Sequence, residues 1–176
     1  MFQLSLPVNE QDHQTGNLKA PVMLVEYGDF QCSRCGTAYP LIKELLKEYK
    51  DELNFVFRHF PLQEIHPQAM IAALAAEAAG RQGKFWEMHD VLFQNQDNLT
   101  GNSTLNYAEA LHLDITKFGN DWKNNEQLSK VESDFKSGLE SGVTGTPSFY
   151  INGQRLNSYD ESYKSLSDAV RSLIGD

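Results

Sequence analysis

Three segments near the start of the chain alternate between strand-like and helix-like patterns of apolar residues. The apolar run Val22–Val25, which is β-branched at both ends, predicts a buried strand. The segment Asn54–Phe60 is rich in strand formers and is followed by Pro61, so it predicts a second strand. Between them lie apolar residues spaced as on one buried helix face, at Leu41, Ile42, Leu45, Leu46 and Tyr49. Together these segments predict a βαβ unit with parallel strands and a right-handed crossover.

The middle of the chain, from about residue 62 to about residue 142, has helical patterns only. We predict four helices in it, centred on His66–Gly80, Phe85–Leu92, Leu105–Leu113 and Leu128–Leu139. The first is apolar nearly all round and is therefore expected to be buried, and the last should end before Gly142. Residues 1–20 are polar and are expected to form loops.

The end of the chain returns to strands. Asn152–Gly153 suits a type I′ turn and lies between Phe149–Ile151 and Gln154–Leu156, which predicts a β-hairpin. A closing helix is indicated by Tyr163, Leu166, Val170 and Leu173. The order of elements predicts a single α/β domain over residues 1–176, with an all-helical insertion at about 62–142 between a βαβ half and a ββα half.

The composition and charge of the chain argue against some classes of function. The chain has 176 residues and a formal net charge of −9, and it contains no basic run. This charge argues against nucleic acid as the main partner, because phosphate binding needs clustered Lys and Arg. No stretch has the roughly 18 apolar residues of a membrane helix. We expect no signal peptide, so the protein is expected to be cytoplasmic if Met1 is native and periplasmic or secreted if the sequence is a mature form.

The chain has two cysteines, and they stand three positions apart at Cys32 and Cys35. Such a spacing between a strand and a helix indicates redox chemistry or half of a metal site. Zinc usually takes four ligands, and neither a second C-x-x-C nor any metal spacing among the five histidines is present, so we expect no metal site. With no nucleotide or flavin motif, we expect the two sulfurs to be the only redox centre and no cofactor.

A cysteine at a helix N-terminus faces unpaired backbone N–H groups and the positive end of the helix dipole, which favour the thiolate. We therefore expect Cys32 to be the nucleophile, with a pKa clearly below that of a free thiol, and Cys35 to be the resolving thiol. The residues between them, Ser33 and Arg34, should tune the pair. The charge of Arg34 is expected to stabilise the thiolate, against the opposing charge of Glu26 and Asp29.

Two motifs together resemble the DsbA-like branch of the thioredoxin superfamily. They are Val25–Gly36, which contains both cysteines, and Gly142–Phe149 far downstream. The resemblance implies a thioredoxin fold with a helical insertion, and protein disulfide exchange through a mixed disulfide at Cys32. It also implies that Thr146–Pro147 is a cis-proline loop that binds substrate backbone.

By the same resemblance, Glu26 matches a buried acid that moves protons during exchange. Ser33 replaces the proline that is commoner in this branch, which leaves the net direction of catalysis open. The implied partners are protein thiols and disulfides and a recycling redox partner.

Other functions remain open at this stage. Within the same class, the chain could be a cytoplasmic reductase or isomerase. From another class, a glutathione-linked transferase or isomerase can use the same scaffold, but it does not need Cys35. A third alternative is a binding module without turnover. We also expect Phe30, Tyr39 and Phe149 to form an apolar rim for substrate around the cysteines.

Overall fold

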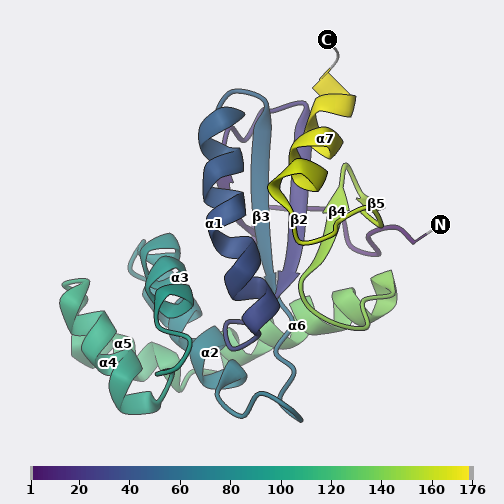
Figure 1. The fold of residues 1–176 in the computed structure, drawn as a ribbon. Coiled ribbons are helices and arrows are strands. Elements are labelled where there is room, and N and C mark those ends of the chain that lie inside the picture. Colours follow the sequence, from purple (N-terminus) through teal and green to yellow (C-terminus); the bar gives the residue numbers. More distant parts are fainter. Residues whose placement is uncertain (1, 175–176) are drawn as a thin grey trace.

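The computed structural model describes residues 2–174 and contains one central five-stranded sheet (Figure 1). The strands run in the spatial order β1-β3-β2-β4-β5. Their bounds are β1 His13–Gly16, β2 Val22–Gly28, β3 Leu53–His59, β4 Ser148–Ile151 and β5 Gln154–Arg155. β2 and β3 are parallel and α1 connects them, so the predicted βαβ unit is confirmed, and the other three pairs are antiparallel.

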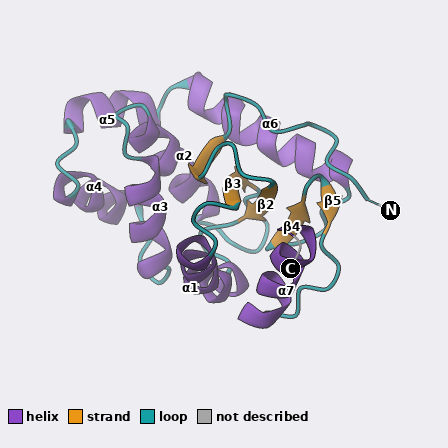
Figure 2. Ribbon diagram, turned by 90° about the horizontal axis from the view of Figure 1, so that it is seen from above, coloured by secondary structure: helices purple, strands orange, loops and turns teal. Residues whose placement is uncertain are grey.

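Within residues 2–174, seven helices lie around this sheet. Their bounds are α1 Ser33–Glu48, α2 Ala69–Gly80, α3 Phe85–Gln94, α4 Gly101–Ala110, α5 Ile115–Trp122, α6 Asn125–Ser141 and α7 Tyr163–Ile174. Seen from above, α1 and α7 cover one face of the sheet and α6 crosses the other, while α2 to α5 gather at one side (Figure 2). The described residues therefore form an α/β fold. The segment between β3 and β4 contains helices but no strand, as predicted.

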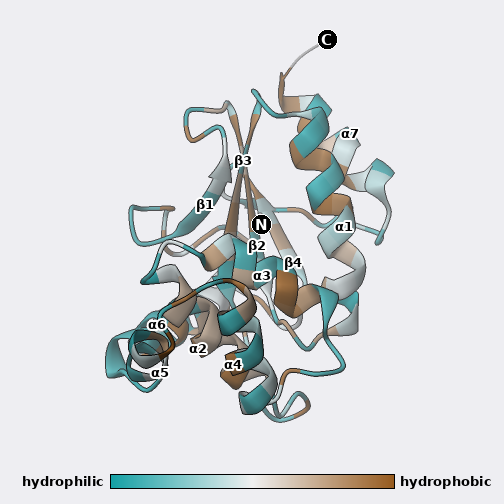
Figure 3. Cartoon of the chain, turned by 90° about the vertical axis from the view of Figure 1, so that its left-hand side faces the viewer, coloured by the Kyte–Doolittle hydropathy of each residue, from teal (hydrophilic) through white to brown (hydrophobic). Residues whose placement is uncertain are grey.

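The two faces of the sheet bury separate apolar clusters because successive side chains of a strand point to opposite faces. Leu24 and Phe57 pack with α1 and α7, whereas Val25, Tyr27 and Val56 pack with residues near α6. Apolar residues gather on the central strands, and polar residues face outward on the helices (Figure 3). Among the described helices, none combines the length and the apolar character needed to cross a membrane.

Two expectations about the elements were wrong. The N-terminal segment is not all loop, because His13–Gly16 pairs antiparallel with β3 and supplies the edge strand β1. The middle of the chain holds five helices rather than four: the missed one is α5, whose first turn is capped by the Asp114 side chain accepting from the Lys117 N–H. The hairpin prediction is confirmed, since Asn152 and Gly153 both have positive φ, at 45° and 82°.

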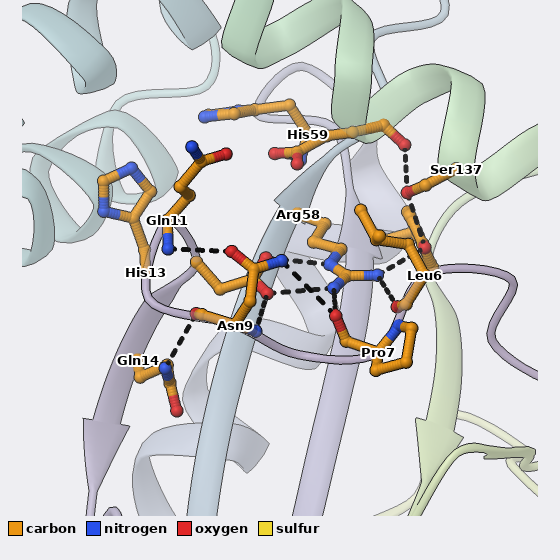
Figure 4. Close-up of polar contacts among 12 residues, drawn as sticks. Leu6, Pro7, Asn9, Gln11, His13, Gln14, Arg58, His59 and Ser137 are labelled. Carbon is orange, nitrogen blue, oxygen red and sulfur yellow. Dashed lines mark hydrogen bonds and ion pairs between the residues drawn. The ribbon is translucent and has the colours of Figure 1, made fainter.

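Arg58 fixes the N-terminal segment against the sheet (Figure 4). Its guanidinium is fully buried and forms two hydrogen bonds of 2.9 Å to the Asp12 carboxylate. It also donates to the Leu6 and Pro7 carbonyls, at 2.8 and 3.2 Å, and to the Tyr27 hydroxyl, at 3.0 Å. One side chain of β3 thus holds the chain that leads into β1.

Candidate active site

The two cysteines lie where β2 passes into α1. Cys32 is the N-cap of α1, with extended backbone angles, and Cys35 lies in the first turn. Cys32 is 7% exposed and Cys35 is fully buried, so Cys32 is the thiol closer to solvent, as predicted. Both are free thiols.

The surroundings of the two sulfurs push their pKa values apart. The pKa of Cys32 is lowered to about 5, and the main cause is a hydrogen bond from Cys35. Burial raises this pKa, whereas hydrogen bonds with Thr146 and from the backbone N–H groups of Cys35 and Arg34 lower it further. Burial, together with Cys32 and the charge of Glu26, raises the pKa of Cys35. At neutral pH the site therefore holds a Cys32 thiolate beside a protonated Cys35, which is the protonation that a nucleophile and a resolving thiol require.

The charge of Arg34, which is expected to stabilise the thiolate, is not among the main causes of the lowered Cys32 pKa. Its guanidinium is exposed and pairs with Glu161, at 2.6 and 2.7 Å. Its backbone N–H is what helps to lower the pKa of Cys32. Ser33 is the first residue of α1 and is exposed. Asp29, expected to oppose the thiolate, instead accepts a hydrogen bond of 2.7 Å from His66.

Glu26 is buried in the middle of β2, at 2% exposure, beside Phe57 of β3 and Phe149 of β4. Burial and the negative charge of Cys32 raise the pKa of Glu26 to about 8, although a hydrogen bond with the Cys35 side chain acts in the opposite direction. Its Oε1 atom has no hydrogen-bond partner among the described residues. The acid is therefore protonated at neutral pH and lies next to Cys35.

A cavity of about 50 Å³ separates Glu26 from the insertion helices and is lined by His89 and Asp90 of α3 and by Lys43 of α1. The His89 Nε2 atom is also buried without a partner within residues 2–174, while its Nδ1 lies 3.1 Å from Asp90 Oδ1. A water molecule needs only about 10–15 Å³ of such space, so the cavity has room for water between the two unpartnered atoms.

The Glu26→Gln variant is expected to change how stability depends on pH. A carboxyl whose pKa is raised by folding favours the folded state at low pH, and this contribution is lost as pH rises from about 4.5 to about 8. Relative to wild type, the reduced variant should gain on the order of 3 kcal/mol in unfolding free energy between pH 5 and pH 8.

Urea unfolding of both reduced proteins at the two pH values measures this difference. Glu132→Gln, which replaces an exposed acid on α6, is the matched control and should follow wild type. Equal changes with pH in wild type and Glu26→Gln would show that Glu26 titrates as an ordinary exposed acid.

The Thr146–Pro147 loop faces the nucleophile. Its peptide bond is cis, and the Cys32 sulfur lies 3.4 Å from the Thr146 carbonyl oxygen. Thr146 is buried and Pro147 is half-buried. An open hollow beside the loop is lined by Arg34, Arg155 and Tyr159, so an extended chain can lie against the loop next to the thiolate.

Sequence reasoning missed the side chains that hold the active-site turn. The Gln96 amide, in the loop after α3, donates to the carbonyls of Phe30 and Cys32, both at 2.8 Å. A Cβ at Gly36 would come within 2.0 Å of the Gln96 side chain, so only glycine allows this approach. The Asp29 carboxylate accepts from the backbone N–H groups of Gln31 and Leu62. No spacing in the sequence could have indicated contacts between such distant segments.

The expected apolar rim around the cysteines is wrong. Phe30 and Phe149 are 1% and 2% exposed and belong to the core under α1. Tyr39 is half-buried and stacks on Phe93, with ring centroids 5.4 Å apart. Phe30 lies in the turn between β2 and α1 and Phe149 lies on β4, and both rings are too deeply buried to receive a substrate.

Comparisons with known proteins agree with this fold. The sequence pattern of the family described as Thioredoxin matches residues 8–171. The chain belongs to the thioredoxin family. Among solved structures, BdbD from Bacillus subtilis superposes with a TM-score of 0.86 at 21% identity, covering 99% of both chains. A thioredoxin-like oxidoreductase from Silicibacter pomeroyi DSS-3 has a TM-score of 0.83 at 25% identity, covering 92% of this chain and 91% of that one.

The thiol-disulfide exchange protein alpha-DsbA2 from Wolbachia pipientis has a TM-score of 0.80 at 20% identity, covering 94% of this thioredoxin-family chain and 88% of its own. The fold is therefore that of the DsbA-like thioredoxins. A curated relative, the Na(+)/H(+) antiporter NhaA 1 of Salinispora arenicola, is 43% identical over 99% of this chain and 26% of its own length. The chain spans about a quarter of the length of the curated relatives it matches.

Proposed function

We propose that this chain exchanges disulfides with protein substrates through a mixed disulfide at Cys32. The observation that carries the proposal is a Cys32 thiol whose pKa is lowered to about 5, next to a protonated Cys35 and facing the Thr146–Pro147 loop. Solved thiol-disulfide exchange proteins with the same fold support it.

The reductive direction runs in two steps. The Cys32 thiolate attacks a substrate disulfide; one substrate sulfur leaves as a thiolate and takes a proton from water, and the other is bound to Cys32. Cys35 then gives its proton to water and attacks the Cys32 sulfur, which forms the Cys32–Cys35 bond and releases the second substrate thiolate. The substrate gains two electrons and the cysteine pair loses them. The oxidative direction is the reverse.

The glutathione-linked alternative is less well supported by the site. Cys35 is buried, and its hydrogen bond is the main cause of the lowered Cys32 pKa. This second thiol therefore takes a direct part in the chemistry, as dithiol exchange requires. A glutathione-linked enzyme needs only the first thiol. The choice between an oxidase and a reductase or isomerase depends on the reduction potential of the pair.

Equilibration with glutathione buffers, read out by alkylation of free thiols, measures this potential. A value near −120 to −180 mV indicates a disulfide donor, for which we propose an exported location, and a value near −270 mV indicates a reductase, for which we propose the cytoplasm. Turnover is measured with reduced peptide and with insulin. A pair that forms no reversible disulfide, or that supports no turnover in either assay, would leave a binding module as the remaining function.

A further inference from the structure

Two histidines and a glutamate meet between β1, β3 and α2, outside the active site. His13 Nε2 and His59 Nε2 both contact the Glu77 Oε1 atom, at 2.7 and 2.8 Å. The ligand atoms of the three residues all lie within 4.8 Å of one another. In Figure 4, His13 lies on the N-terminal segment and His59 follows Arg58 at the end of β3.

We propose that His13, His59 and Glu77 bind a divalent transition-metal ion of the zinc type, with water as the fourth ligand. Two imidazole nitrogens and one carboxylate are a ligand set that zinc takes when one position stays open. Imidazole and carboxylate together also favour this class of ion over Mg²⁺ and Ca²⁺, which prefer oxygen ligands alone.

The three side chains are oriented before any ion binds. The His13 ring stacks on Phe85, with centroids 3.4 Å apart and planes 4° from parallel. The His59 ring stands edge-on to Phe57 and Phe85, with centroids at 5.5 and 5.9 Å. These contacts hold both Nε2 atoms toward the same carboxylate, so little side-chain entropy is lost on binding.

Charge and access also suit a cation. The Glu77 Oε1 atom faces both imidazole Nε2 atoms, at 2.7 and 2.8 Å, so a carboxyl group lies where a cation would bind. The side chains of His59 and Glu77 are 1% and 9% exposed, whereas that of His13 is 20% exposed. His13 is therefore the side from which an ion and its water ligand can enter.

Binding requires a small opening of the cluster. Ligand atoms about 2.0–2.1 Å from a tetrahedral zinc ion stand about 3.3 Å apart, so each nitrogen must move roughly 0.5 Å away from the carboxylate oxygen. The Nε2 protons of His13 and His59 must also move to Nδ1, and the Nδ1 atom of His59 is buried without a partner within the described residues. Both changes cost free energy, so we expect micromolar rather than nanomolar affinity.

The cysteines are competing ligands, so the test uses the full chain with Cys32→Ser and Cys35→Ser as the parent protein. Calorimetric titration with Zn²⁺ is expected to give one ion per chain and a higher melting temperature in Zn²⁺. Adding His13→Gln or Glu77→Gln should weaken binding at least about tenfold, because each removes one ligand. His112→Asn, which replaces an exposed histidine elsewhere, should bind as the parent does.

Co²⁺ provides a second readout. Its visible absorption in the parent should report tetrahedral nitrogen and oxygen ligands and should disappear in His13→Gln. Circular dichroism without metal checks that His13→Gln stays folded, as expected for a partly exposed side chain. Either of two results would overturn the proposal: no binding of Zn²⁺ and Co²⁺ to the parent, or equal affinity in the parent and in His13→Gln.

Discussion

The Cys35→Ser variant is expected to accumulate as a mixed disulfide between Cys32 and a substrate thiol, and Cys32→Ser is expected to form none. Cys32 stays at the N-terminus of α1, where the backbone N–H groups of residues 34 and 35 still help to lower its pKa. Without the Cys35 sulfur, no second thiol is close enough to displace the substrate. Incubation with an oxidised peptide, followed by non-reducing electrophoresis and mass spectrometry, detects the adduct.

Turnover in the insulin or peptide assay should fall to the uncatalysed rate in both variants, for different reasons. Cys32→Ser lacks the nucleophile, whereas Cys35→Ser stops after the first step. The hydrogen bond from Cys35 is the main cause of the low Cys32 pKa, so Cys35→Ala, which has no donor in its place, should raise that pKa and form the adduct faster at higher pH, whereas the hydroxyl of Cys35→Ser can still donate. An adduct on Cys32→Ser but not on Cys35→Ser would reverse the two roles.

The elements that the sequence predicts correctly are those with a strong local pattern. β2 begins at Val22, as the apolar run indicates, and α6 ends before Gly142, whose φ of 87° is the left-handed conformation that favours glycine. The hairpin follows from two residues that both adopt positive φ. In each case the physical cause lies within a few residues of the chain.

The misses have causes that act between distant segments. β1 is the polar stretch His13–Gly16, and it becomes a strand because its backbone pairs with β3, about forty residues later. α5 is short and is not among the helices predicted from apolar spacing, although Asp114 at its start is a residue typical of an N-cap. A search for capping residues would have indicated α5, but nothing local would have indicated β1.

The candidate site also combines features that the sequence predicts with features that it does not. The two cysteines are predicted by their spacing, and the pKa of Cys32 has the predicted direction. The side-chain role expected for Arg34 depended on proximity in sequence, whereas in the fold that side chain turns to Glu161. Gln96 supports the turn from an insertion loop, and only the three-dimensional arrangement reveals it.

The Arg58→Ala variant is expected to lose about 3–5 kcal/mol of unfolding free energy. The Arg58 and Asp12 side chains are 0% and 3% exposed, so removing the guanidinium leaves a buried carboxylate without its countercharge. It also leaves the Leu6 and Pro7 carbonyls without their donor. Such a loss is a large share of the roughly 5–15 kcal/mol that stabilises a domain. Urea unfolding at pH 7 measures it.

Two further variants separate the ion pair from other effects. Lys164→Ala breaks an exposed pair with Asp168 on α7, where the side chains are 82% and 51% exposed, and should cost less than about 1 kcal/mol. Combining Asp12→Asn with Arg58→Ala should cost less than the sum of the two single changes, because the double variant leaves no buried charge without its countercharge. If Arg58→Ala cost no more than Lys164→Ala, the N-terminal segment would be held to the sheet by its other contacts, and the buried pair would add no stability.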